Sequence, residues 1–263
     1  MADAPISPRV AITRGLQTSV TTFTAVRVAD VEAHLAKGAC YEVTQPPEAD
    51  PTRTANRVYV DLDGKAAPDL TRDAFEALVT TLVAALQTIL QLQGDGGSLM
   101  SACKWRGWKK GNVVNIISFR LTLTKRHGTH AAVKEFVLST LAPRIAAAVG
   151  ALIPFHIDTE GAVGPCLQLV TSVYSRGRKV RMLRQSKPYN HDGRWVDEQR
   201  PFELVGGGTV SDTLITLIPA DSVPLPEPSP LATTTRKRRL SSREEPARSR
   251  RKEEATARRA WKT

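Results

Sequence analysis

Two aspartates, Asp61 and Asp63, follow an apolar run in the stretch VYVDLDGK. Alternate residues of a β-strand point to the same face, so a strand here would bring the two carboxylates close together. Like charges at that distance repel unless a cation lies between them, and hard divalent ions prefer carboxylate oxygens. The spacing therefore predicts a metal-binding pair at a strand end, with Gly64 letting the chain turn away at once. A plain surface turn of the D-x-D-G type is the alternative.

Two enzyme classes share this beginning. Aspartyl-phosphate phosphatases carry DxDGT after an apolar strand, but here Lys65 follows Gly64, and GDGG at 94–97 does not supply the later acidic pair of that class. Nucleotidyl transferases use DxD or DxE, which the sequence matches. The chain contains no GxxxxGK[ST], so a P-loop helicase module is excluded for these residues.

Basic side chains are concentrated in residues 169–188, LVTSVYSRGRKVRMLRQSKP. The planar guanidinium fork of arginine matches phosphate oxygens, so this run predicts contacts to a triphosphate or to a template backbone. A solvated basic edge strand is the alternative. The cations of the run are Arg176, Arg178, Lys179, Arg181, Arg184 and Lys187.

Aromatic and basic residues alternate in the loop KWRGWKKGN, which begins at Lys104. Aromatic rings stack on bases and cations follow phosphates, so the loop is a candidate nucleic-acid contact, with a solvated hairpin tip as the alternative. The residues concerned are Trp105, Arg106, Trp108, Lys109 and Lys110. His127 and His130 stand three residues apart but lack an evident third ligand, which favours an exposed helical turn over a metal site.

The formal net charge is +11, and twelve of the 37 Lys/Arg but five of the 26 Asp/Glu lie in residues 222–263. The positive charge points to a polyanionic partner and is strongest in a tail that we expect to be disordered. Three cysteines without a CxxC pattern favour a reducing compartment over a disulfide framework or structural zinc. With no run of eighteen apolar residues, we expect no membrane span.

Periodicity predicts an α+β domain of mixed sheets with packed helices. Helices are expected at 30–38, at 71–92 with Thr71 as its N-cap, and at 128–148, interrupted by Pro143. The expected domains are a flexible N-terminus (1–20), a catalytic domain (21–221) and the basic tail (222–263). Strands are expected at 22–28, 40–45, 57–62, 98–105, 113–124, 153–157, 166–174 and 178–184.

The order of the motifs resembles the catalytic domain of archaeo-eukaryotic-type primases, nearest to the primase-polymerase branch and its relatives in large DNA viruses. The segments that carry the resemblance are YEV, VYVDLDG, ISFRL, TSVYSRGRKVRMLRQSK and DTLIT, between residues 39 and 218. The most specific is the VY-x₃-R-x₂-R-x₅-K run, residues 173–187.

This family uses three motifs, and the chain departs from two of them. The first, DxD or DxE, is matched by Asp61 and Asp63. The second, SxH, becomes Ser118, Phe119 and Arg120, so that an arginine stands where the phosphate-binding histidine is expected. The third metal-binding aspartate is replaced by Val170, and Asp158 is the candidate that would substitute for it. The resemblance further implies phosphate contacts by Ser118, Arg120, Arg178, Arg181 and Lys187.

The resemblance implies template-directed primer synthesis in DNA replication, with Mg²⁺ or Mn²⁺ on Asp61 and Asp63. The implied partners are single-stranded DNA, nucleoside triphosphates and a helicase on another chain. The implied location is the nucleus or the cytoplasm, including a viral replication site in a host cell. Because Val170 cannot bind a metal, the alternative is a degenerate primase fold that binds nucleic acid without catalysis.

Overall fold

The computed structural model describes residues 9–14, 24–37, 40–44, 55–92, 96–109, 112–158, 164–175, 178–186, 188–191, 194–197 and 200–228. The first compact unit spans Met1–Pro226, and the second, Glu227–Thr263, is described at its first two residues. The predicted disorder of the basic tail therefore lies almost wholly outside the described residues.

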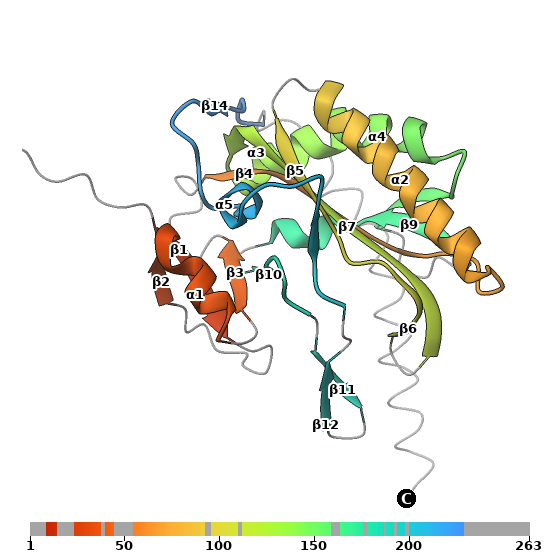
Figure 1. Ribbon diagram of the computed structural model, residues 1–263. Helices are drawn as coiled ribbons and strands as arrows, with labels where there is room; N and C mark the ends of the chain where they lie inside the picture. Colours follow the sequence, from red (N-terminus) through yellow and green to blue (C-terminus); the bar gives the residue numbers. More distant parts are fainter. Residues whose placement is uncertain are drawn as a thin grey trace, which may run out of the picture. The chain divides into compact units, whose positions relative to one another are not determined.

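An eight-stranded sheet forms the centre of the first unit (Figure 1). Its path runs β13-β5-β7-β4-β9-β8, and β6 and β14 pair with β7 beside this path. The pairs β8–β9 and β14–β7 are parallel, and the other pairs are antiparallel. The strands are β4 (Asn56–Lys65), β5 (Gly97–Ser101), β6 (Lys104–Lys109), β7 (Asn112–Gly128), β8 (Phe155–Ile157), β9 (Cys166–Leu169), β13 (Glu203–Val205) and β14 (Val223–Pro224).

Helices cover one face of this sheet (Figure 1). The first is α2 (Arg72–Leu92), and the others are α3 (His130–Phe136), a π-helical turn η2 (Val137–Leu141) and α4 (Ala142–Val149), which follow one another without a break. Leu82 and Leu86 of α2 lie in one buried cluster with Leu62 and Phe119 of the sheet. Thr71 caps α2 as predicted, since its hydroxyl accepts a hydrogen bond from the Ala74 amide (3.2 Å).

A four-stranded sheet, in the order β10-β3-β1-β2, packs on the other side. Its side chains share a second buried cluster with Met100 of β5 and with Phe202. Its strands are β1 (Arg9–Arg14), β2 (Thr24–Arg27), β3 (Cys40–Thr44) and β10 (Arg178–Arg181). Also present are η1 (Val28–Asp30), α1 (Val31–Leu35), η3 (Thr171–Tyr174), α5 (Val210–Thr213) and the hairpin β11 (Pro188–His191)–β12 (Arg194–Asp197).

The fold is thus of the α+β class, and several predicted boundaries were wrong. The expected flexible N-terminus contains β1, which pairs with both β2 and β3. The ordered domain continues past residue 221, because β14 pairs with β7 and Leu225 is buried. Residues 166–174 are divided between β9 and the 3-10 helix η3. The predicted strand 57–62 extends to Lys65, so the aspartate pair lies inside a strand.

By length and composition, α2 could cross a membrane over Arg72–Gln91, where the mean hydropathy is 1.4. In this fold its apolar side packs against the sheet, and its exposed side carries an Arg72–Glu76 ion pair (2.7 Å) and threonines. Core helices pass the same test of length and hydropathy.

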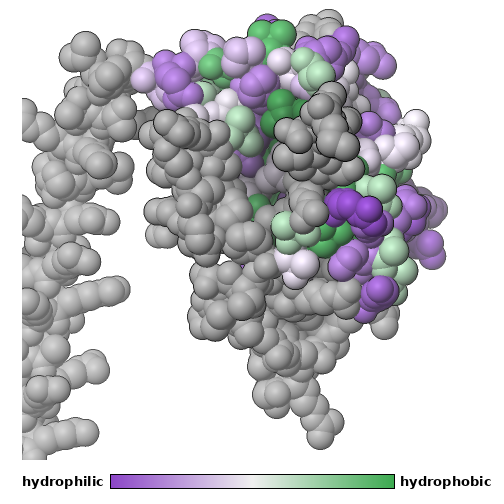
Figure 2. All heavy atoms as spheres, turned by 90° about the vertical axis from the view of Figure 1, so that its left-hand side faces the viewer, coloured by the Kyte–Doolittle hydropathy of each residue, from purple (hydrophilic) through white to green (hydrophobic). Residues whose placement is uncertain are grey.

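On the face shown in Figure 2, hydrophilic and hydrophobic side chains of the described residues are interspersed.

Candidate functional site

Three neighbouring strands, β7, β4 and β9, bring the first two motifs together on one face. Asp61 lies opposite Arg120, and Asp63 lies opposite Ser118 on one side and Gln168 on the other. Directly opposed residues of an antiparallel pair share a face, as do residues i and i+2 of one strand. These side chains therefore occupy the side of the sheet away from α2. The predicted proximity of the two aspartates and the SxH-like pair holds in the structure.

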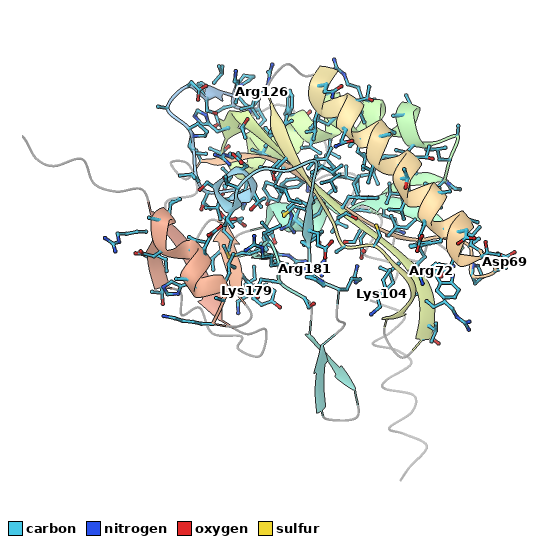
Figure 3. All side chains as sticks on the ribbon, viewed as in Figure 1. Asp69, Arg72, Lys104, Arg126, Lys179 and Arg181 are labelled. Carbon is cyan, nitrogen blue, oxygen red and sulfur yellow. The ribbon has the colours of Figure 1, made fainter. Side chains whose placement is uncertain are left out.

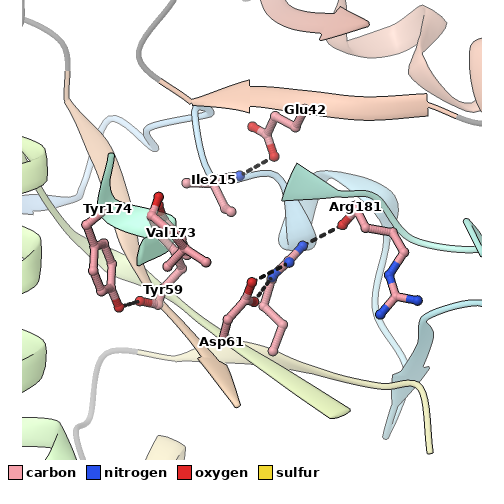
Figure 4. Close-up of polar contacts among 8 residues, drawn as sticks. Glu42, Tyr59, Asp61, Val173, Tyr174, Arg181 and Ile215 are labelled. Atoms are coloured by element: carbon pink, nitrogen blue, oxygen red, sulfur yellow. Dashed lines mark hydrogen bonds and ion pairs between the residues drawn. The ribbon is translucent and has the colours of Figure 1, made fainter. Parts of the chain in front are cut away.

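The Asp61 carboxylate is bound at both oxygens by Arg120 (Figure 4). Its Nε donates to Oδ1 at 2.5 Å and its Nη2 donates to Oδ2 at 2.9 Å. The Arg120 side chain is 4% exposed and that of Asp61 is 19% exposed. The remaining guanidinium nitrogen, Nη1, donates to the backbone carbonyl of Arg181. A guanidinium therefore supplies the positive charge that the sequence assigned to a metal ion.

The position of the third motif lies beside Asp61, but without a ligand. The Val170 amide donates to the Asp61 carbonyl (2.9 Å), and the Val170 side chain packs against the apolar core. Asp158 has another role: its exposed carboxylate accepts the Thr171 amide (2.7 Å) at the start of η3.

The residues present do not fit a two-metal site. No group of three or more His, Cys, Asp or Glu within the described ranges could hold a metal ion. Asp61 already directs both carboxylate oxygens at Arg120, and a valine occupies the third ligand position. The expected Mg²⁺ or Mn²⁺ site at Asp61, Asp63 and Asp158 is therefore not supported by the geometry of these side chains.

Arg120 belongs to an arginine cluster, defined here as Arg120, Arg181 and Arg200, of which the first two lie over the ring of Phe202. The Phe202 ring centroid lies 5.0 Å from the Cζ atom of Arg120 and 3.9 Å from that of Arg181. Arg181 Nη1 donates to the Arg200 carbonyl (3.1 Å), and buried Arg200 donates to the Ala102 carbonyl (2.9 Å). The sequence assigned Arg181 to a phosphate, and it gave no role to Arg200 or Phe202, which lie eighty residues after Arg120.

The VY pair of the basic run has a structural role. The Tyr174 hydroxyl donates to the Tyr59 carbonyl (2.5 Å), and the Tyr59 hydroxyl donates to the Val173 carbonyl (2.9 Å) (Figure 4). The two rings lie 5.1 Å apart. Burial raises the pKa of both phenols, and the Asp61 carboxylate adds to the shift, so both remain neutral donors. These two bonds fix η3 against β4 two residues before Asp61.

The DTLIT segment fastens the second sheet to the central one. Buried Glu42 of β3 accepts the amides of Ile215 (2.9 Å) and Thr216 (2.6 Å). Arg57 of β4 donates to the carbonyl of Ser211 (2.8 Å). Asp212 forms a capping box with Thr209 at the start of α5. The resemblance included this segment without a mechanism, and its contacts are structural.

The other predicted contacts are divided between the fold and the surface. Trp105 is tied to the fold, since its indole donates to the Leu70 carbonyl (3.1 Å) and the ring packs against the core. Arg106 lies over that ring, 5.5 Å from its centroid, and is exposed.

Ser118, a predicted phosphate contact, is buried, and its amide donates a hydrogen bond to the Cys103 sulfur (3.4 Å). Arg178 is exposed on β10. Lys110 and Lys187, and the side chains of Trp108 and Lys109, lie outside the described residues.

His130 is buried at the start of α3, and neither ring nitrogen has a hydrogen-bond partner among the described residues. Burial lowers its pKa to about 4. The unfolded chain, with a histidine pKa near 6.5, then binds more protons between these two values. We expect stability to fall as the pH drops from about 6.5 to about 4, by at most about 1.4 kcal/mol per pH unit for one proton. Urea unfolding at a series of pH values measures this slope.

Replacing His130 with leucine should flatten the dependence, whereas the same change at exposed His156 should leave it intact. An unchanged slope in His130→Leu would show that other groups cause the acid sensitivity.

Comparisons with known proteins leave the family of this chain open. No family model matches it, and no curated protein is significantly similar to it.

Proposed function

We propose that the chain is a primase-like domain that binds single-stranded nucleic acid in DNA replication and has lost metal-dependent nucleotide transfer. The order of the motifs supports the family, and the bidentate Arg120–Asp61 pair carries the loss of catalysis.

The energetics of the pair explain why it opposes metal binding. Arg120 is nearly inaccessible to water, so pulling Asp61 away would leave a buried cation without its counter-charge. A divalent ion placed between the aspartates would also lie close to that guanidinium and be repelled by it. Two-metal nucleotidyl transfer requires carboxylates that hold the ion activating the attacking hydroxyl, and Val170 offers none.

The second candidate is metal-dependent primer synthesis itself. It is favoured by the placement of Asp61 and Asp63 on one face, with the third motif at the end of the neighbouring strand β9. It requires that Asp61 exchange Arg120 for an ion during the reaction.

One experiment distinguishes the two candidates. The full chain is incubated with a single-stranded DNA template, with and without a primer, labelled nucleotides and Mg²⁺ or Mn²⁺, while binding of the same DNA is measured by fluorescence anisotropy. We expect binding that is unaffected by EDTA, and no extension product. A wild-type product that disappears in Asp63→Ala would establish the second candidate and overturn the first.

A gain-of-function variant tests the reason for the loss. Arg120→His with Val170→Asp restores the expected motif residues and should create a Mn²⁺ site detectable by calorimetry. Val170→Asp alone is the matched control, because it keeps Arg120 on Asp61 and should bind Mn²⁺ weakly or not at all.

A further inference from the structure

Two lysines continue the face that carries the aspartates. Lys65 of β4 and Lys104 of β6 both lie opposite Ile116 of β7, one on each side of it. Lys65 is also two residues after Asp63, so it shares the face of Asp61 and Asp63. With strands about 4.8 Å apart, the two lysine Cα atoms are separated by about 10 Å. We call Lys65 and Lys104 the lysine pair.

The lysine pair lies at the more accessible end of this face. Lys65 is exposed and Lys104 is half-buried. Arg120, on β7 four residues beyond Ile116, is buried. In Figure 3, Lys104 and Arg181 both lie on the side of the sheet away from α2. A flexible lysine at such a place can reach an anion that the buried arginines cannot contact directly.

The charge balance of the face favours an anion over a cation. The lysine pair and the arginine cluster place five cations around the two carboxylates Asp61 and Asp63: Lys65, Lys104, Arg120, Arg181 and Arg200. The charges of Arg200 and Asp63 both act on the thiol of Cys103, whose pKa is raised mainly by burial. The positive charges around the carboxylates of Asp61 and Asp63 therefore outnumber these two negative charges, and a net positive surface attracts polyanions.

We propose that Lys65 and Lys104 hold adjacent phosphates of a single-stranded nucleic acid that crosses this face. The proposal deepens the proposed function and rests on it. The site takes phosphate groups, which a nucleoside triphosphate could also present. Lys65 lies outside the basic run and outside the aromatic loop, and Lys104 is the first residue of the aromatic loop but was not among its candidate contact residues.

The test is the salt dependence of binding to a fluorescent oligo-dT of twenty nucleotides. The variants are Lys65→Gln, Lys104→Gln and their double variant. Each lost contact to a single strand should reduce the slope of log K against log salt by about 0.7, and the double variant should bind on the order of tenfold more weakly at 0.1 M salt. Lys125→Gln is the matched control, because Lys125 is exposed on β7 nine residues beyond Ile116, about 30 Å along the strand.

Each outcome separates this inference from the proposed function. If the double variant binds oligo-dT as tightly as the wild type, with the same slope of log K against log salt, the lysine site is overturned. The proposed nucleic-acid-binding module then still stands. A wild-type chain that binds dTTP but not oligo-dT, and loses dTTP in the double variant, keeps the phosphate site and overturns single-strand binding. A wild-type chain that binds neither ligand overturns both.

Discussion

Replacing Asp61 with alanine is expected to destabilise the protein by about 3–5 kcal/mol, because it leaves a buried charge without its partner. The guanidinium of Arg120 is 4% exposed and directs two of its three nitrogens at the Asp61 carboxylate. Because the Arg120 side chain itself is nearly inaccessible to water, solvent compensates poorly for the lost carboxylate. Urea unfolding of the wild type and of Asp61→Ala at neutral pH measures the difference.

The matched variants are Arg120→Met and the double variant Asp61→Ala/Arg120→Met. Arg120→Met should cost less than Asp61→Ala, since the Asp61 side chain is 19% exposed and water can solvate it. Methionine keeps much of the volume over Phe202, so the double variant should be more stable than Asp61→Ala alone. Additive losses across this cycle would contradict a coupled pair.

Mn²⁺ gives an independent reading of the same pair. A ligand that binds the folded state raises the apparent stability. We therefore expect the wild-type unfolding midpoint to be the same in Mn²⁺ and in EDTA, whereas Arg120→His with Val170→Asp should be stabilised by the ion.

Features of local sequence predicted the α+β class and the longest helix. The apolar period of α2 and the Thr71 cap are local signals that indicate the helix, and packing of its apolar side on the sheet supplies most of its stability. The alternation of a strand also predicted that Asp61 and Asp63 share one face.

The partner of Asp61 could not be predicted from the sequence. The pairing of Asp61 with Arg120 depends on the register of β4 against β7, and a shift by one residue would turn one of the two side chains to the other face. Phe202 and Arg200 come from a segment about 140 residues after Asp61 in the sequence, and no sequence pattern links the two segments. The sequence therefore indicated which residues share a face, but left open whether an arginine or an ion neutralises the carboxylate.

Gly64 illustrates how a glycine can be misinterpreted. Next to two aspartates it was expected to end the strand, because glycine is common where a chain turns. In the structure it lies within β4, paired with Leu167 of β9 and Ile117 of β7. Its missing side chain serves a close approach between strands, which no local pattern reveals.

Gly64→Ala should therefore cost about 3 kcal/mol, at the upper end for overpacking a buried site. The added methyl group would overlap the Cys166 carbonyl oxygen and lie 3.0 Å from Leu167 Cα, both backbone atoms that no rotamer change can move. To accommodate it, β9 must move away from β4, which weakens the bond from the Val170 amide to the Asp61 carbonyl and the pairing of Asp63 with Gln168.

Two measurements on Gly64→Ala separate this strand contact from a simple loss of flexibility. The urea midpoint should fall, while Lys65→Ala, one residue on and exposed, should stay within about 0.5 kcal/mol of the wild type. Hydrogen exchange should increase first at the β9 amides of Leu167 and Leu169, because β9 is the strand that the methyl group displaces. Equal exchange in the variant and the wild type, with an unchanged midpoint, would mean that β4 and β9 do not approach as closely in solution as Gly64 permits.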